Sequence, residues 1–158
     1  IPSVDDTQID IPVTAFIPGD WITDPDEKIN AYRLATQCDN NDELVQFASN
    51  LIDRYGTLPK PVESLIEVMK LKIISKKCGF SRIKLSKPNI ELETMMNEPA
   101  FNLLRKGLPN HLHGRFIFKK GDRCSNVTIR GLGILDSDKL LDQLNDWLNI
   151  MNAEINIE

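Results

Sequence analysis

The apolar and polar positions divide the chain into a helical first half and a second half in which strands alternate with helices. Apolar residues recur every three or four positions, the repeat of an α-helix, over about residues 25–38, 40–56 and 60–78. A capping residue or a proline opens each stretch, and Gly56 and Gly79 follow the second and the third. We therefore expect three helices joined by short links.

The second half changes to the two-residue alternation that is typical of strands. Alternating stretches flank residues 86–89, and two more flank residues 120–122, so each turn predicts a strand pair. A short helix is predicted over about residues 98–106, and residues 136–137 open a last helix.

Together these elements predict one α+β domain. Its expected architecture has three N-terminal helices, two strand pairs forming a mainly antiparallel sheet, and a C-terminal packing helix. Residues 9–158 form this domain, and residues 1–8 lead into it as an extended arm. The alternation of Ile9, Ile11 and Val13 predicts an entering strand.

The length and the composition agree with a single folded domain. The chain has 158 residues, of which 41% are hydrophobic and 27% are charged, so dominant disorder is excluded. No apolar stretch is long enough for a membrane span, and residues 1–6 lack the basic flank and apolar run of a signal peptide. The chain does not begin with Met, which suggests a segment of a longer protein.

Charge is segregated along the chain. The net charge is −9 over residues 1–69, +10 over residues 70–130 and −5 over residues 131–158. The segments can neutralise one another within one fold, or they can form separate patches that dock charged partners. The pattern alone leaves both interpretations open.

The residues that could support catalysis or bind a metal are few. The three cysteines form no CxxC pair, which argues against a thiolate zinc site and fits a reducing cytoplasmic location. His111 and His113 could bind a metal with Asp122 or Cys124, but the neighbouring Pro109 favours a polar loop. The sequence therefore predicts no enzyme, no cofactor and no metal site in this chain.

A basic stretch over residues 70–87 suggests contact with nucleic acid. Phe80 is its only aromatic residue, so stacking on single-stranded bases is poorly supported. An accessory DNA-contacting module remains the alternative function. The candidate phosphate contacts are Lys72, Lys76, Lys77, Arg82 and Lys84.

Three stretches together resemble one known family. They are residues 15–24 (AFIPGDWITD), residues 51–61 (LIDRYGTLPKP) and residues 79–84 (GFSRIK). Their order and spacing are similar to the C-terminal domain of the bacterial transcription-repair coupling factor (Mfd). The similarity runs from about residue 8 to the end of the third helix, and residues 98–101 (EPAF) resemble relatives of the cyanobacterial type.

This resemblance implies a regulatory domain without catalysis of its own. The parent protein in that family is an ATP-driven DNA translocase of transcription-coupled nucleotide excision repair, and it binds RNA polymerase, UvrA and duplex DNA. ATP and Mg belong to its upstream domains, from which residues 1–8 would arrive. The terminal domain is expected to pack on the parent's N-terminal UvrA-binding module and mask it in the resting protein, as an autoinhibitory contact in the cytoplasm.

Within the second helix, the resemblance implies docking residues. Asn50, Asp53 and Arg54 lie off the apolar stripe at positions i, i+3 and i+4, so we expect one exposed surface. Asp53 fits the family's acidic docking contacts, whereas Asn50 is neutral where an acid is common. The structural alternative is that Gly56 forms a left-handed cap while Asp53 or Arg54 braces the turn to Pro59.

Overall fold

The structure is a computed structural model that describes residues 6–155. Within it, the chain forms two compact units. Residues 13–73 make up the helical unit, and residues up to Pro12 together with those from Ile74 onward make up the sheet unit. The arm predicted for residues 1–8 lies largely outside the described residues, although Thr7 is buried and its hydroxyl donates to the Phe80 carbonyl at 2.7 Å.

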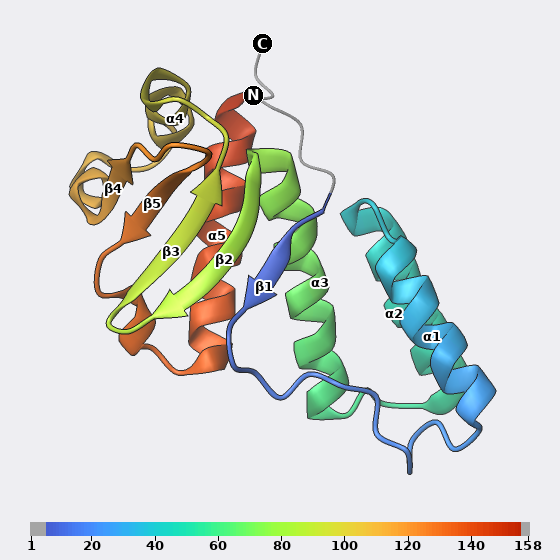
Figure 1. Ribbon diagram of the computed structural model, residues 1–158. Helices are drawn as coiled ribbons and strands as arrows, with labels where there is room; N and C mark the ends of the chain where they lie inside the picture. The colour runs from blue at the N-terminus through green and yellow to red at the C-terminus, as the bar shows by residue number, and fades with distance from the viewer. Residues whose placement is uncertain (1–5, 156–158) are drawn as a thin grey trace. The chain divides into compact units, whose positions relative to one another are not determined.

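The three predicted N-terminal helices are confirmed (Figure 1). They are α1 (Pro25–Gln37), α2 (Asn41–Tyr55) and α3 (Lys60–Cys78), and α3 continues from the helical unit into the sheet unit. Asp24 caps α1 by accepting a hydrogen bond from the Asp26 amide at 2.8 Å, and Asn40 caps α2 by accepting from the Glu43 amide at 2.8 Å. Local capping chemistry thus sets where these helices begin.

The helical unit has a core of its own. Each helix turns its apolar stripe inward, and the segment before α1 adds Ile17 and Ile22, which are 1% exposed. The Ile17 amide donates to the Tyr32 hydroxyl at 2.7 Å, which fixes that segment against α1. The remaining buried members are Ala31, Ala35, Leu44, Phe47, Leu51, Val62, Leu65, Ile66 and Ile73.

The sheet unit contains a five-stranded sheet in the order β1-β2-β3-β5-β4. Its strands are β1 (Gln8–Asp10), β2 (Phe80–Ser86), β3 (Asn89–Thr94), β4 (Phe116–Lys119) and β5 (Ser125–Ile129). Both predicted strand pairs are confirmed, and the antiparallel pairing of β3 with β5 joins them into one sheet. The entering strand pairs parallel to β2, so the sheet is mixed and mainly antiparallel, and the α+β fold class is confirmed.

Two further helices belong to the sheet unit. These are α4 (Glu98–Arg105) and the C-terminal α5 (Ser137–Ile155), close to their predicted bounds. The segment with His111 and His113 differs from the predicted loop, because it forms the 3-10 helix η1 (Asn110–Arg115). A second 3-10 turn, η2 (Leu132–Ile134), precedes α5. Such short turns lack the repeated apolar period that predicts a longer helix.

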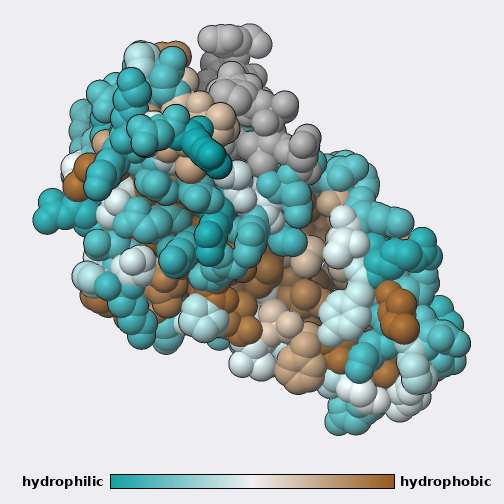
Figure 2. All heavy atoms as spheres, in the orientation of Figure 1, coloured by the Kyte–Doolittle hydropathy of each residue, from teal (hydrophilic) through white to brown (hydrophobic). Residues whose placement is uncertain are grey.

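The two faces of the sheet differ in polarity. Alternate residues such as Ile83, Leu92 and Val127 are buried on the face along which α5 lies (Figure 1). Trp147 of α5 meets Phe116 of β4 edge to face, with ring centroids 5.5 Å apart. The opposite face carries charged side chains, and the surface over the sheet is mostly hydrophilic in the view of Figure 2. Within the described residues, no helix is long and apolar enough to cross a membrane.

The reactivity of the Cys78 thiol reports how tightly the end of α3 is packed. Its side chain is fully buried, its Sγ lies 3.4 Å from the Leu148 carbonyl, and burial raises the pKa of the thiol to about 12. Thiolate is the reactive form, so we expect alkylation at pH 8 to modify Cys38 and Cys124, whose side chains are only partly buried. Cys78 should react only in denaturant, as mass spectrometry can follow. Three fast-reacting thiols in the native protein would contradict this packing.

Candidate functional site

The outward side of α2 is the candidate functional surface. The apolar stripe of α2 turns Leu44, Phe47 and Leu51 into the core, so the opposite side of the helix faces solvent. Asn50 and Asp53 are both exposed there, one turn apart. The Asn50 side-chain oxygen accepts a hydrogen bond from Gln46 at 2.9 Å. Within the described residues, the Asp53 carboxylate has no partner and is available for an external contact.

Arg54 has a structural role as well as exposure. Its guanidinium forms an ion pair with Glu27 of α1 and lies over the Tyr55 ring, 5.5 Å from the centroid. The Tyr55 hydroxyl donates to the same carboxylate at 3.1 Å. Partial burial, followed by this hydrogen bond, raises the pKa of Tyr55. Arg54 therefore ties α2 to α1, and the Glu27 carboxylate partly compensates its positive charge.

The purely structural interpretation of this helix end, a left-handed cap at Gly56 and a braced turn to Pro59, agrees with the structure only in part. Gly56 has a φ of 91°, a positive value that favours glycine, and its amide donates to the Ile52 carbonyl at 2.8 Å. Its ψ of −162° lies outside the left-handed helical region that we predicted. Arg54 bonds to α1, whereas the predicted brace was to the turn at Pro59.

Two exposed apolar residues on α2 were not among the surface residues predicted from the sequence. Val45 is 64% exposed and Ile52 is 46% exposed. They are seven residues apart and therefore lie on one side of the helix, whereas the adjacent Asp53 points about a quarter turn away on the same solvent-exposed half. Their position off the apolar stripe was the signal that could have revealed them. We call Val45, Asn50, Ile52 and Asp53 the α2 outer face.

The five candidate phosphate contacts do not form one surface. Lys72, Lys76 and Lys77 lie on α3, and only the last two are exposed. Arg82 and Lys84 project from β2 on the face of the sheet opposite Ile83, the buried residue between them. The basic stretch is therefore divided between a helix and the polar face of the sheet.

Carboxylates offset part of the charge on that polar face. The Arg82 guanidinium lies 2.5 Å from the Asp10 carboxylate, and this bond holds the pKa of Asp10 below its usual value. Glu91 of β3 pairs in register with Lys84, so a negative charge stands beside the lysine. Such a face is a poor match for a phosphate backbone.

The candidate metal ligands are not gathered in the structure. His113 Nε2 lies 2.7 Å from the Leu108 carbonyl oxygen, a contact that ties η1 to the chain just before it. Across residues 6–155, no three His, Cys, Asp or Glu side chains lie together as a metal-binding group.

Comparison with known proteins matches one family. The model of the TRCF domain matches residues 11–102. The transcription-repair-coupling factor of Mycobacterium bovis is 31% identical over 78 residues, which are 49% of this chain and 6% of that protein. The transcription-repair-coupling factor of Staphylococcus epidermidis is 24% identical over 148 residues, 94% of this chain and 12% of that protein. The chain thus spans a small part of the relatives it matches.

A solved structure extends the similarity to the fold. It is described as the crystal structure of the C-terminal domain of a transcription-repair coupling factor. It superimposes with a TM-score of 0.75 at 16% sequence identity, covering 94% of this chain and 93% of that chain. At this identity the match shows a shared fold, including the part of the chain beyond residue 102.

Proposed function

Because this chain belongs to the TRCF domain family and has the fold of the C-terminal domain of transcription-repair coupling factors, we propose that it is the non-catalytic, autoinhibitory domain of such a factor. In this proposal it packs on the UvrA-binding module of the longer protein and masks it until the factor engages stalled RNA polymerase. ATP, Mg and duplex DNA bind elsewhere in that protein. The domain then contributes to transcription-coupled DNA repair by controlling access.

The observation that supports this role most directly is the exposed, unpartnered Asp53 carboxylate, on the same solvent-exposed half of α2 as Val45 and Ile52. A basic partner would pair with the carboxylate, and the two apolar side chains would be covered at the same time. Exposed ion pairs contribute only about 0–1 kcal/mol each, so such a contact is weak by itself. Tethering within one chain raises the effective concentration and makes a weak contact sufficient. A weak contact also suits a mask that must open.

The test is a calorimetric titration of this chain with the separate UvrA-binding module at low and moderate salt. We expect saturable binding that weakens as salt rises, since opposite charges meet across the interface. Added UvrA should displace the chain, because both partners would use the same surface. Binding that UvrA leaves unchanged would refute masking, and an absence of binding even at high concentration would refute docking by the untethered domain.

Replacing Asp53 identifies the docking surface. The Asp53→Ala variant should retain the fold and bind the UvrA-binding module about two- to fivefold more weakly, as expected for loss of one exposed ion pair. Asp142→Ala is the matched control, because it removes the same charge from an exposed position on α5 in the sheet unit. Equal affinities for the two variants would exclude Asp53 from the interface.

The alternative of a DNA-contacting module has less support. Arg82 is engaged by Asp10, and Glu91 stands beside Lys84. Duplex DNA should therefore bind weakly in a titration matched to the one above. DNA binding that is lost on Lys76→Glu and Lys77→Glu substitution would favour the alternative over autoinhibition.

A further inference from the structure

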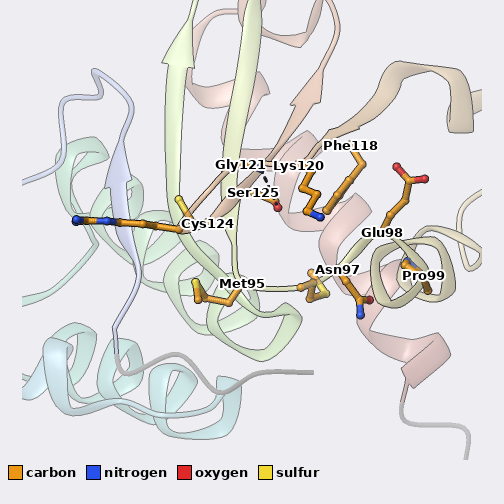
Figure 3. Close-up of a pocket in the computed structure, with 11 residues that line it drawn as sticks. Met95, Asn97, Glu98, Pro99, Phe118, Lys120, Gly121, Cys124 and Ser125 are labelled. Carbon is orange, nitrogen blue, oxygen red and sulfur yellow. Dashed lines mark hydrogen bonds between the residues drawn. The ribbon is translucent and has the colours of Figure 1, made fainter.

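A pocket in the sheet unit is unrelated to the α2 outer face. It lies where the turn from β3 into α4 approaches the loop between β4 and β5 (Figure 3), and its volume is about 470 Å³. This size falls within the range of protein ligand pockets, about 300–1,000 Å³. In Figure 3, Met95 and Cys124 lie on one side, and Asn97, Glu98 and Pro99 lie on the α4 side.

Specific hydrogen bonds shape the wall that leads into α4. The Thr94 hydroxyl donates to the Gly79 carbonyl at 2.9 Å and accepts from the Met96 amide at 3.0 Å. One residue later, the Asn97 side chain caps α4 by accepting from the Ala100 amide at 2.9 Å. These bonds fix the backbone of this wall, so the wall is preformed without a ligand.

The opposite wall depends on Gly121. Its amide lies 3.4 Å from the Ser125 hydroxyl, which closes the β4–β5 loop on itself (Figure 3). A Cβ at Gly121 would overlap the carbonyl oxygen of Cys124, so the loop packs this closely only because the residue is glycine. A preformed pocket loses little conformational entropy when it binds a ligand.

The lining combines an apolar floor with an exposed thioether. Phe118 lines the pocket and stacks on the fully buried Phe101, with centroids 5.8 Å apart and an interplanar angle of 26°. Met96 is 1% exposed, so the floor is continuous with the core of the sheet unit. Met95 is 59% exposed at the rim, where its flexible side chain can adapt to an incoming apolar group.

Two cationic residues are among those that line the same pocket. Lys120 and Arg123 are exposed, and within the described residues neither has a hydrogen-bond or ion-pair partner. Glu98 is the one carboxylate among the lining residues, so the lining carries a net positive charge. An apolar floor beside unpaired cations fits a ligand that has an apolar group next to negative charge.

We propose that this pocket binds an acidic peptide segment of a partner protein, with one large apolar side chain inserted over Phe118 and flanking carboxylates on Lys120 and Arg123. A polypeptide supplies both features within a few residues. A nucleic acid fits less well, because Phe118 is half-buried against Phe101 and offers no open stacking platform. The pocket lies in the sheet unit, so this inference goes beyond the proposed docking through α2.

The test uses NMR spectra of the isotope-labelled 158-residue chain. The probe is an eight-residue peptide with blocked ends, in which one Phe is flanked on each side by Asp and Glu. Two control peptides replace the Phe by Ser or the acidic residues by Asn and Gln. We expect saturable shift changes confined to residues 94–101 and 116–125 with the acidic Phe peptide, at concentrations up to about 1 mM.

Adjacent lysines supply a matched pair of variants. Lys119 and Lys120 are both exposed, but only Lys120 lines the pocket. Lys120→Glu should weaken binding about tenfold, whereas Lys119→Glu, with the same change in net charge, should weaken it less than about threefold at physiological salt. Both positions are on the surface, so both variants should fold, and their spectra will confirm this.

The possible results distinguish a site for an acidic peptide from a site for nucleic acid and from no site. Tighter binding of the acidic Phe peptide than of both controls, with the expected order of the lysine variants, supports the proposal. No saturable shift at the highest concentration, equal affinity for all three peptides, or shifts elsewhere in the chain would overturn it. Stronger competition by a single-stranded oligonucleotide than by the peptide would assign the pocket to nucleic acid instead. None of these results depends on the UvrA-binding module, so failure here leaves the proposed function untouched.

Discussion

Replacing Phe101 by alanine should lower the free energy of unfolding by about 3–5 kcal/mol, because a fully buried aromatic ring is removed and the surroundings collapse only partly. Phe101 stacks on Phe118, and the Arg105 guanidinium lies 5.5 Å from its ring centroid, so the substitution also removes these two contacts. Arg105 would then lose support for its bond to the Phe116 carbonyl, 2.9 Å long. Chemical denaturation followed by circular dichroism measures the loss.

The control for Phe101 lies on the same helix. Leu103 is 67% exposed, so Leu103→Ala deletes apolar atoms without opening a cavity and should change stability by less than about 0.5 kcal/mol. If the two variants unfold at the same denaturant concentration, Phe101 does not anchor α4 to the sheet unit.

Replacing Gly121 by alanine should cost about 1–3 kcal/mol, the usual range for forcing extra atoms into a packed site. The new Cβ would overlap a backbone oxygen, that of Cys124, so no side-chain rotation can relieve the clash. We expect the β4–β5 loop to open and the bond from the Gly121 amide to Ser125 to break. Unfolding curves measure the cost, and NMR shifts show whether the change stays within residues 119–125.

Gly114 supplies the comparison, because a Cβ there meets no atom within 4 Å. Gly114→Ala should leave stability nearly unchanged or slightly higher, since alanine restricts the unfolded chain. A Gly121→Ala variant as stable as Gly114→Ala would show that the loop relaxes at no cost. In the expected case, Gly121→Ala also weakens peptide binding at the pocket.

The helices could be predicted because their signals are local. Asp24 and Asn40 cap helices through bonds to residues only two or three positions away, so a short window of sequence contains the cause. The two hairpins were expected to form one sheet, but which strands join them, and in which register, could not be predicted in the same way. The register that joins β3 to β5, such as Leu92 opposite Val127, depends on packing against α5 and not on neighbouring residues.

The candidate surfaces show the same division. The exposure of Asn50 and Asp53 followed from the helical period, and the structure agrees. The partner of Arg54 did not, because Glu27 is 27 residues away along the chain. The pocket is formed by two loops that come together only when β5 pairs between β3 and β4, so no motif in either loop predicts it.

The parallel pairing of β1 with β2 has a consequence for how the molecule can be divided. Asp10 and Arg82 are 72 residues apart, and the helical unit occupies the chain between them. In terms of connectivity, the helical unit is an insertion between the first two strands of the sheet. A single cleavage that removes the helices also removes β1 and exposes the backbone edge of β2, which invites pairing with another chain. Separating the two units cleanly requires two cuts and a new linker from β1 to Ile74.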